Sequence, residues 1–139
     1  MTTFSPLSQS MRKDIRDLHK RSHREREQVF LLEGERLVGE ALRGGAALRE
    51  VVLPSQASEY ALTLARRAAQ AGVPVYETPG RHFEALCDTK TPQSILAVAE
   101  YPDLKPDFTA PVVILDGISD PGNEGTIIRT ADWFGYRTV

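Results

Sequence analysis

The chain has 139 residues, of which 41% are hydrophobic and 26% are charged, and these proportions exclude whole-chain disorder, collagen-like repeats and coiled coil. No apolar run approaches the roughly 18 residues of a membrane-spanning helix, and the start lacks the apolar core of a signal peptide, so we expect a soluble, cytoplasmic protein with no membrane partner. The net charge of −2 argues against nucleic-acid binding through bulk positive charge, and one cysteine, Cys87, with three histidines in polar surroundings offers neither a disulfide nor a metal site.

The first predicted element is a helix that begins at Ser8 or Ser10, because either side chain can cap its N-terminus. The almost wholly polar segment 20–28 is predicted to be the end of this helix and a loop. One buried stripe along the helix is predicted for Met11, Ile15 and Leu18.

Positive charge is concentrated in residues 1–26, which carry seven basic and three acidic groups, whereas the rest of the chain carries ten basic and sixteen acidic groups. Such a cluster attracts phosphate, because each neutralised phosphate releases counterions. The alternative is a solvated helix face with internal ion pairs, such as Asp17 with Arg21, and charge alone does not decide between them. The candidate nucleic-acid-binding residues are Arg12, Lys13, Arg16, Lys20, Arg21, Arg24 and Arg26.

Strand and helix patterns then alternate as far as Glu100, and the glycines at 44, 45 and 72 end two of the helices. This alternation predicts an α/β sandwich with a mostly parallel or mixed sheet and helices on its faces. The predicted strands are 29–34, 48–54, 73–79 and 94–100, and the predicted helices are 35–42, 55–72 and 82–86.

The segment 101–111 has three prolines and is predicted to be a linker. After it, the apolar run 112–117 is predicted to be a central parallel strand, and the residues after Gly135 open a second strand. The 28 residues from 112 to 139 are too few to bury a core of their own, so we expect a truncated second domain. The expected division is 1–100, 101–111 and 112–139.

The turn and helix at 120–135 contain the candidate catalytic residues. Asn123 is predicted to cap a helix that begins near Gly125, and Arg129 is predicted to point away from the apolar face that contains Ile127. An amide, free backbone N–H groups and a guanidinium could together surround a phosphate or a ribose. The alternative is an ordinary strand-to-helix turn with a surface arginine, since the spacing matches no standard phosphate-binding loop.

The stretch ILDGISDPGNEGTIIRTADWFG resembles the first motif of the SpoU (TrmH-like) branch of the SPOUT RNA methyltransferases. The matching core is N-x-G-x-x-x-R-T-A at Asn123, Gly125, Arg129, Thr130 and Ala131. Upstream, the segments FLLEGERLVGEAL and TKTPQSILAVAE look like the L30e-like substrate-binding domain of many members. The resemblance implies an L30e-like three-layer α/β sandwich followed by the truncated start of an α/β-knot (SPOUT) domain.

The resemblance also implies an activity: transfer of a methyl group from S-adenosylmethionine to a ribose 2′-hydroxyl of ribosomal or transfer RNA. Arg129 would be the catalytic arginine and Asn123 would order the site, while the seven basic residues would contact RNA phosphates. A guanidinium stays protonated at pH 7, so clamping a phosphate and stabilising a developing alkoxide is the minimum role of Arg129.

In this family the cofactor pocket, the knot and the dimer interface come from two later motifs, which lie outside residues 1–139. We therefore expect this chain alone to be inactive and the full-length protein to be a homodimer. Glu124 differs from the apolar residues that are usual at its position. Two other hypotheses stay open: a non-enzymatic L30e-like RNA-binding module, and a nucleotide-dependent enzyme that binds phosphate at the Asn123 loop.

Overall fold

The computed structural model describes residues 4–89, 92 and 94–139. It divides the chain into a first unit that ends at Pro102 and a second unit from Asp103 to Val139. Residues 101–111 form neither helix nor strand. Part of the loop predicted between Asp88 and Gln93 lies outside the described residues.

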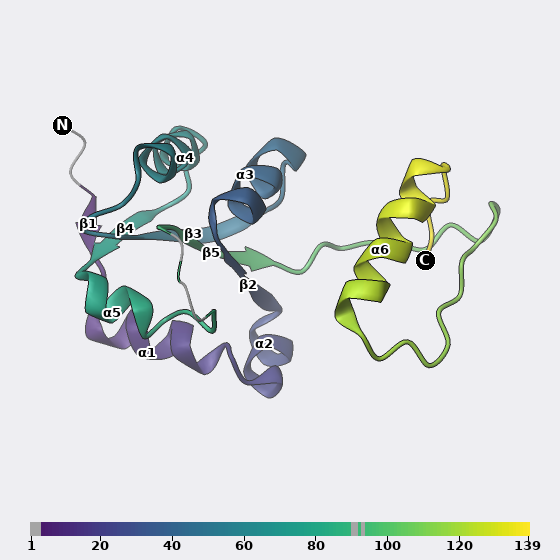
Figure 1. Cartoon of the computed structure of the whole chain (residues 1–139), viewed down its shortest axis with the longest axis horizontal. Helices are drawn as coiled ribbons and strands as arrows, with labels where there is room; N and C mark the ends of the chain where they lie inside the picture. The colour runs from purple at the N-terminus through teal and green to yellow at the C-terminus, as the bar shows by residue number, and fades with distance from the viewer. Residues whose placement is uncertain (1–3, 90–91, 93) are drawn as a thin grey trace. The chain divides into compact units, whose positions relative to one another are not determined.

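A five-stranded mixed sheet lies at the centre of the first unit (Figure 1), in the order β1-β4-β3-β5-β2. The strands are β1 Ser5–Pro6, β2 Val29–Glu33, β3 Leu48–Pro54, β4 Val75–Thr78 and β5 Leu96–Glu100. β1, β4 and β3 run parallel, whereas β5 runs antiparallel to both of its neighbours, β3 and β2. The predicted mixed α/β sheet is confirmed, with β1 added at its edge, a two-residue strand too short to leave a pattern in the sequence.

The described residues of the first unit form five helices, and four of them cover the two faces of this sheet. The helices are α1 Gln9–Asp17, α2 Arg21–Glu27, α3 Glu35–Gly44, α4 Glu59–Gln70 and α5 Gly80–Glu84. α3 and α4 lie on one face, and α1 and α5 lie on the other (Figure 1). The side chain of Ser8 accepts a hydrogen bond from the backbone N–H of Met11, which confirms the cap predicted for α1.

The segment 20–28 differs from the prediction, because most of it forms the helix α2 rather than a loop. Arg and Glu are good helix formers, and the side chains of Arg21 and Glu25 pair one turn apart at 2.6 Å. Gln28 ends the helix in the left-handed conformation, with φ of 54°. The helix α2 therefore forms without an apolar stripe, because the helix propensity of its residues and its ion pair favour the helical conformation.

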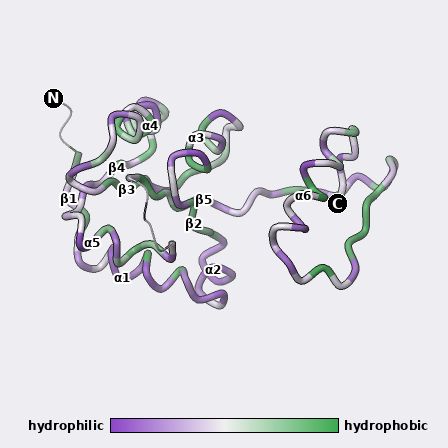
Figure 2. Tube along the Cα trace, in the orientation of Figure 1, coloured by the Kyte–Doolittle hydropathy of each residue, from purple (hydrophilic) through white to green (hydrophobic). Residues whose placement is uncertain are grey.

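Two apolar cores lie on the two faces of the sheet, because successive strand residues point to opposite faces. On β3, Val51 and Leu53 join the core under α3 and α4, whereas Val52 joins the core under α1 and α5. Ile95 and Leu96 divide between the two cores in the same way. Figure 2 shows this hydrophobic character along β3 and β5, while α1 and α2 are largely hydrophilic.

The second unit is built around one helix, α6 Pro121–Trp133. The two predicted strands are wrong: the described segments meet only at one parallel bridge, between Val112 and Thr138. A strand needs lateral partners, and among the described residues Val112 forms a bridge with Thr138 alone.

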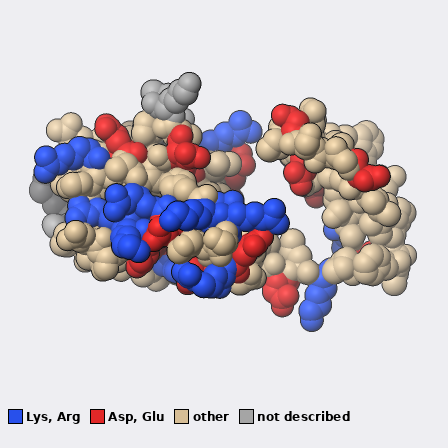
Figure 3. Space-filling model, turned by 90° about the horizontal axis from the view of Figure 1, so that it is seen from below, with Lys and Arg blue, Asp and Glu red and all other residues tan. Residues whose placement is uncertain are grey.

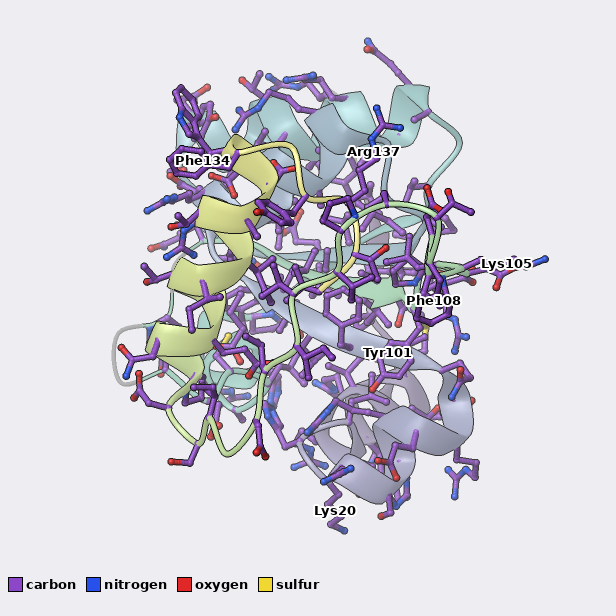
Figure 4. All side chains as sticks on the ribbon, turned by 90° about the vertical axis from the view of Figure 1, so that its right-hand side faces the viewer. Lys20, Tyr101, Lys105, Phe108, Phe134 and Arg137 are labelled. Carbon is purple, nitrogen blue, oxygen red and sulfur yellow. The ribbon has the colours of Figure 1, made fainter. Side chains whose placement is uncertain are left out.

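Much of the apolar surface of this unit stays in water, and Ala131 is the one buried residue of α6. Figure 4 shows Phe134 at the end of α6 and Phe108 on the loop before the helix. Large side chains exposed by more than 70% are Leu104, Phe108, Ile114, Trp133 and Phe134. Within the described residues this unit has no enclosed apolar core, as its length predicts.

Candidate functional site

The helix that carries the candidate catalytic residues begins four residues earlier than predicted. Its N-cap is Asp120, whose Oδ2 accepts a hydrogen bond of 2.7 Å from the backbone N–H of Asn123, and Pro121 occupies the first turn. The prediction that Asn123 is the cap is therefore wrong. Asp is as good a cap as Asn, and Pro is favoured at the first helical position, so the Asp-Pro pair contains the signal that the prediction missed.

Asn123 and Glu124 lie inside the exposed first turn of α6. A carboxylate in the first turn stabilises a helix, because the N-terminus carries the positive end of the helix dipole. This gives Glu124 a structural role. The side chain of Asn123 makes no hydrogen bond to another described residue, so its amide is available to a ligand.

The Arg129 side chain is exposed, as the sequence predicts, and it folds back towards the start of α6. Its Nη2 donates a hydrogen bond of 3.2 Å to Oγ1 of Thr126. A Cβ atom added to Gly125 would lie 3.2 Å from Nη1 of the same guanidinium. The missing side chain of Gly125 thus leaves room for Arg129 to lie along the helix.

No hydrogen bond joins Arg129 to Asn123 among the described residues. Six residues on a helix turn through about 600°, which places the two side chains about 120° apart. The structure therefore brings Arg129 together with Gly125 and Thr126 rather than with Asn123. A substrate group would have to span both faces to touch both side chains.

A hollow of about 380 Å³ lies beside α6 within the second unit. Its lining is mostly apolar, and its side-chain polar groups are hydroxyls, such as those of Thr126 and Thr130. Both of these hydroxyls donate to backbone carbonyls one turn earlier in the helix. The hollow is lined by Val113, Thr126, Ile127, Thr130, Ala131, Phe134 and Tyr136.

We expect Asp120→Ala to loosen the first turn of α6, because the backbone N–H of Asn123 loses its acceptor. The loss of an N-cap costs about 1 kcal/mol, which corresponds to roughly fivefold faster hydrogen exchange of the first-turn amides. Exchange measured by mass spectrometry or NMR tests this. Asp120→Asn is the matched control, since Asn also caps helices, and equal exchange in Asp120→Ala and the unsubstituted chain would contradict the assignment.

The candidate RNA-binding residues lie on α1, on α2 and in the turn between them, and five of the seven are engaged within the protein. Asp17 accepts from both Lys13 and Lys20, at 2.8 and 3.3 Å, and these two hydrogen bonds lower the pKa of Asp17 to about 2. Arg21 pairs with Glu25 and Arg26 pairs with Glu27. Internal ion pairs thus form, as in the alternative of a solvated helix face, but Asp17 pairs with Lys13 and Lys20 rather than with Arg21, because the chain turns between α1 and α2.

Arg24 has a different partner, the end of α1. Its Nη1 donates hydrogen bonds of 2.9 and 2.8 Å to the carbonyls of Leu18 and His19. These carbonyls follow the last turn of α1, where cations are favoured by the helix dipole. Arg24 therefore holds α2 against the end of α1.

A band of Lys and Arg side chains crosses the face that includes α1, with acidic side chains beside it (Figure 3). Arg12 and Arg16 differ from the other five candidates, because neither makes an ion pair or a hydrogen bond with another described residue. Surface ion pairs are weak, so the paired residues can still exchange their partners for phosphate.

Cys87 is partly buried and packs against the core under α1 and α5. Burial, together with the nearby Glu33 and Glu84, raises the pKa of its thiol to about 12. The described residues contain no group of three or more side chains suited to a metal ion, and none of their helices has the length and hydropathy to cross a membrane.

The model of the MRM3-like substrate binding domain matches residues 11–97. The chain is 35% identical over 127 residues to the 23S rRNA (guanosine(2553)-2′-O)-methyltransferase RlmP of Bacillus subtilis, covering 91% of this chain and 49% of that protein. It is 30% identical over 128 residues to the mitochondrial rRNA methyltransferase 3 of Homo sapiens, covering 86% and 30%. The chain thus spans half or less of the length of these relatives.

The chain is also similar to solved structures of RNA methyltransferases. A putative RNA methyltransferase of the TrmH family from Porphyromonas gingivalis matches with a TM-score of 0.72 and 38% identity, over 96% of this chain and 51% of that one. An AdoMet-bound rRNA methyltransferase from Sinorhizobium meliloti matches with a TM-score of 0.71 and 31% identity, over 94% of this chain and 50% of that one.

Proposed function

Because the chain belongs to the SpoU (TrmH-like) family of RNA methyltransferases, with an MRM3-like substrate-binding domain at residues 11–97, we propose that its protein methylates a ribose 2′-hydroxyl of ribosomal RNA. The methyl donor would be S-adenosylmethionine, which is bound in the Sinorhizobium meliloti relative. Ribosomal RNA is preferred to transfer RNA because the names of the Bacillus subtilis and mitochondrial relatives specify it, whereas other bacterial relatives are named as tRNA/rRNA methyltransferases.

The observation that carries the proposal within this chain is the exposed guanidinium of Arg129 on α6. A guanidinium has several N–H donors in a fixed plane and stays charged at neutral pH. It can therefore clamp a backbone phosphate beside the reacting ribose and stabilise the negative charge that develops on the 2′-oxygen. The free amide of Asn123, at the N-terminus of the same helix, would order the RNA near that oxygen.

The described residues do not by themselves fit S-adenosylmethionine. The hollow beside α6 contains apolar side chains and hydroxyls, with no carboxylate to accept from the ribose hydroxyls of the cofactor. We place the cofactor pocket, the knot and the dimer interface in a part of the methyltransferase domain outside residues 1–139. The large exposed side chains of the second unit, among them Ile114 and Trp133, support this, since they would pack against that part.

The first unit would then be an L30e-like RNA-binding domain of residues 1–100, joined by 101–111 to the opening of an α/β-knot domain at 112–139. The three layers of the first unit and its basic face are the features that support this assignment. The competing hypothesis is an L30e-like module that binds RNA without modifying it.

One experiment separates these hypotheses: transfer of a tritiated methyl group from S-adenosylmethionine to ribosomal RNA by the methyltransferase that contains this chain. We expect label in nucleotides that resist alkaline hydrolysis, because a methylated 2′-oxygen cannot attack the neighbouring phosphate. RNA binding without any label would favour the module. In a parallel titration we expect no S-adenosylmethionine binding by residues 1–139 alone, and saturable binding would overturn our placement of the pocket.

Gly125→Ala is expected to slow methyl transfer at least tenfold without loss of stability. The new Cβ would lie 3.2 Å from Nη1 of Arg129, so the guanidinium must shift, and small displacements of a catalytic group are costly. Alanine is favoured over glycine within helices by up to about 1 kcal/mol, so unfolding cannot explain a slower reaction. Turnover and thermal midpoint are measured together, with Gly44→Ala, at an open position of α3, as the control. Unchanged turnover in Gly125→Ala would contradict the positioning role.

A further inference from the structure

A small hollow lies between α1 and α5, on the basic face of the first unit and away from α6 in the sequence. Its volume is about 190 Å³, and it is lined by Gln9, Arg12, Arg16, His82, Ala85 and Leu86. Arg12 and Arg16 are four residues apart on α1, so their side chains lie on the same face of the helix. His82 comes from α5, about seventy residues later in the chain.

The charges around this hollow are not balanced by the protein. Arg12, Arg16 and the neighbouring Arg81 make no ion pair with any described residue, and no carboxylate lines the hollow. Partial burial and then the positive charges of Arg12 and Arg81 lower the pKa of His82 below its usual value. Arg12 lines the same hollow as the ring of His82, and Arg81 is the neighbour of His82 in the chain, so both guanidinium groups disfavour the protonated ring.

The acidic groups of the two helices act elsewhere, and Asp14 lines a different hollow together with Lys13 and Asp17. Asp17 accepts from Lys13 and Lys20, and Glu84 acts on the thiol of Cys87. Like charges that are held together without counter-charges repel each other, and a bound anion would remove that repulsion. A protein phosphate-binding site usually has this composition, with guanidinium groups and neutral donors but no carboxylate.

We propose that the hollow between α1 and α5 binds one phosphate of the RNA backbone through Arg12 and Arg16, with the Gln9 amide and the His82 ring as neutral donors. This inference rests on the proposed function and narrows it, because it separates two phosphate-binding arginines from the five basic residues that are engaged within the protein. It also adds Gln9 and His82, which the charge pattern of residues 1–26 does not single out.

The test measures binding of the 139-residue chain to a fluorescein-labelled RNA stem–loop of about 30 nucleotides, by anisotropy, between 50 and 300 mM KCl. The variant R12Q/R16Q removes both guanidinium groups. The matched control, R66Q/R67Q, removes two exposed arginines from α4, on the opposite face of the sheet, and neither of these makes an ion pair with a described residue. A further variant, K20Q/R21Q, removes two of the paired residues.

We expect R12Q/R16Q to bind at least tenfold more weakly at 100 mM KCl, with the slope of log affinity against log salt reduced by about one. R66Q/R67Q should change RNA affinity less than threefold. The loss of affinity in K20Q/R21Q should lie between the losses in the other two variants. The charge-preserving variant R12K/R16K should recover most of the affinity. Circular dichroism and the thermal midpoint verify that each variant is folded.

If R12Q/R16Q and R66Q/R67Q lose RNA affinity equally, or if neither loses any, the proposed phosphate site is wrong. The proposed methyltransferase function would remain intact. A smaller loss of RNA affinity in R12Q/R16Q than in K20Q/R21Q would also contradict the phosphate site, because the paired residues would then be the principal RNA contacts. If the unsubstituted chain binds no RNA at 50 mM KCl, both the site and the RNA-binding role of the first unit fail, and the tritium assay alone then decides the enzymatic proposal.

Discussion

If the proposed function is right, Arg129→Ala in the protein that contains this chain should lower the rate of methyl transfer at least a hundredfold and leave the fold intact. Removal of one group that stabilises developing charge costs about two to three orders of magnitude in other enzymes. Arg129 is exposed and its one side-chain hydrogen bond is to Thr126, so its loss removes little packing. Single-turnover kinetics with saturating S-adenosylmethionine measure the effect on the chemical step.

Two further variants make this result specific. Arg129→Lys keeps the charge but loses the planar set of donors, so an intermediate rate is expected. Arg66→Ala, on α4, removes an exposed arginine that is far from Arg129 in the sequence and should react at the rate of the unsubstituted protein. A normal rate in Arg129→Ala would exclude the catalytic role.

Leu64→Ala should lower the free energy of unfolding of the first unit by about 2 to 5 kcal/mol. Leu64 is on α4, has no exposed surface and belongs to the core under α3 and α4. One of its methyl groups lies 3.6 Å from where a Cβ of Gly39 would be, so α3 and α4 pack closely there. Its truncation leaves a cavity in a core that cannot easily collapse.

Urea unfolding followed by circular dichroism measures this loss. Leu37→Ala on α3 is the control, because Leu37 is 46% exposed and alanine favours a helix. We expect it to change stability by less than about 1 kcal/mol. Similar losses of stability in the two variants would contradict the placement of Leu64 in the buried core under α3 and α4.

The sequence predicts the first unit well where an element has its own boundary signals. The bounds of β3 match the prediction because the apolar run ends at Pro54, and α3 ends at glycines, with Gly45 in the left-handed conformation. The sequence misses α2, because a polar segment leaves no periodicity even when neighbouring charges stabilise a helix.

The second unit shows the limit of local patterns. The apolar run 112–117 has the composition of a buried strand, yet only one bridge forms, because pairing depends on what lies beside a segment rather than within it. At the candidate site the sequence provides the residues but not their arrangement: Asp120 rather than Asn123 caps α6, and Arg129 lies over Gly125.

Local sequence patterns also do not predict the hollow between α1 and α5. Arg12 and His82 meet because β4 pairs with β1, so that α1 and α5, which follow these two strands, line the same hollow. A basic cluster in the sequence cannot distinguish Arg12 and Arg16, which are unpaired, from Lys13 and Lys20, which share Asp17. That distinction needs the positions of the acidic side chains.

The fluorescence of Trp133 can report whether α6 is exposed to water. Trp133 is the single tryptophan of the chain and is 86% exposed. Its fluorescence is therefore that of an indole in water, and it lies on a different unit from the phosphate hollow. A protein surface that packs over Trp133 would shift this emission to shorter wavelengths. The emission therefore measures whether the exposed face of the second unit is in contact with another protein surface.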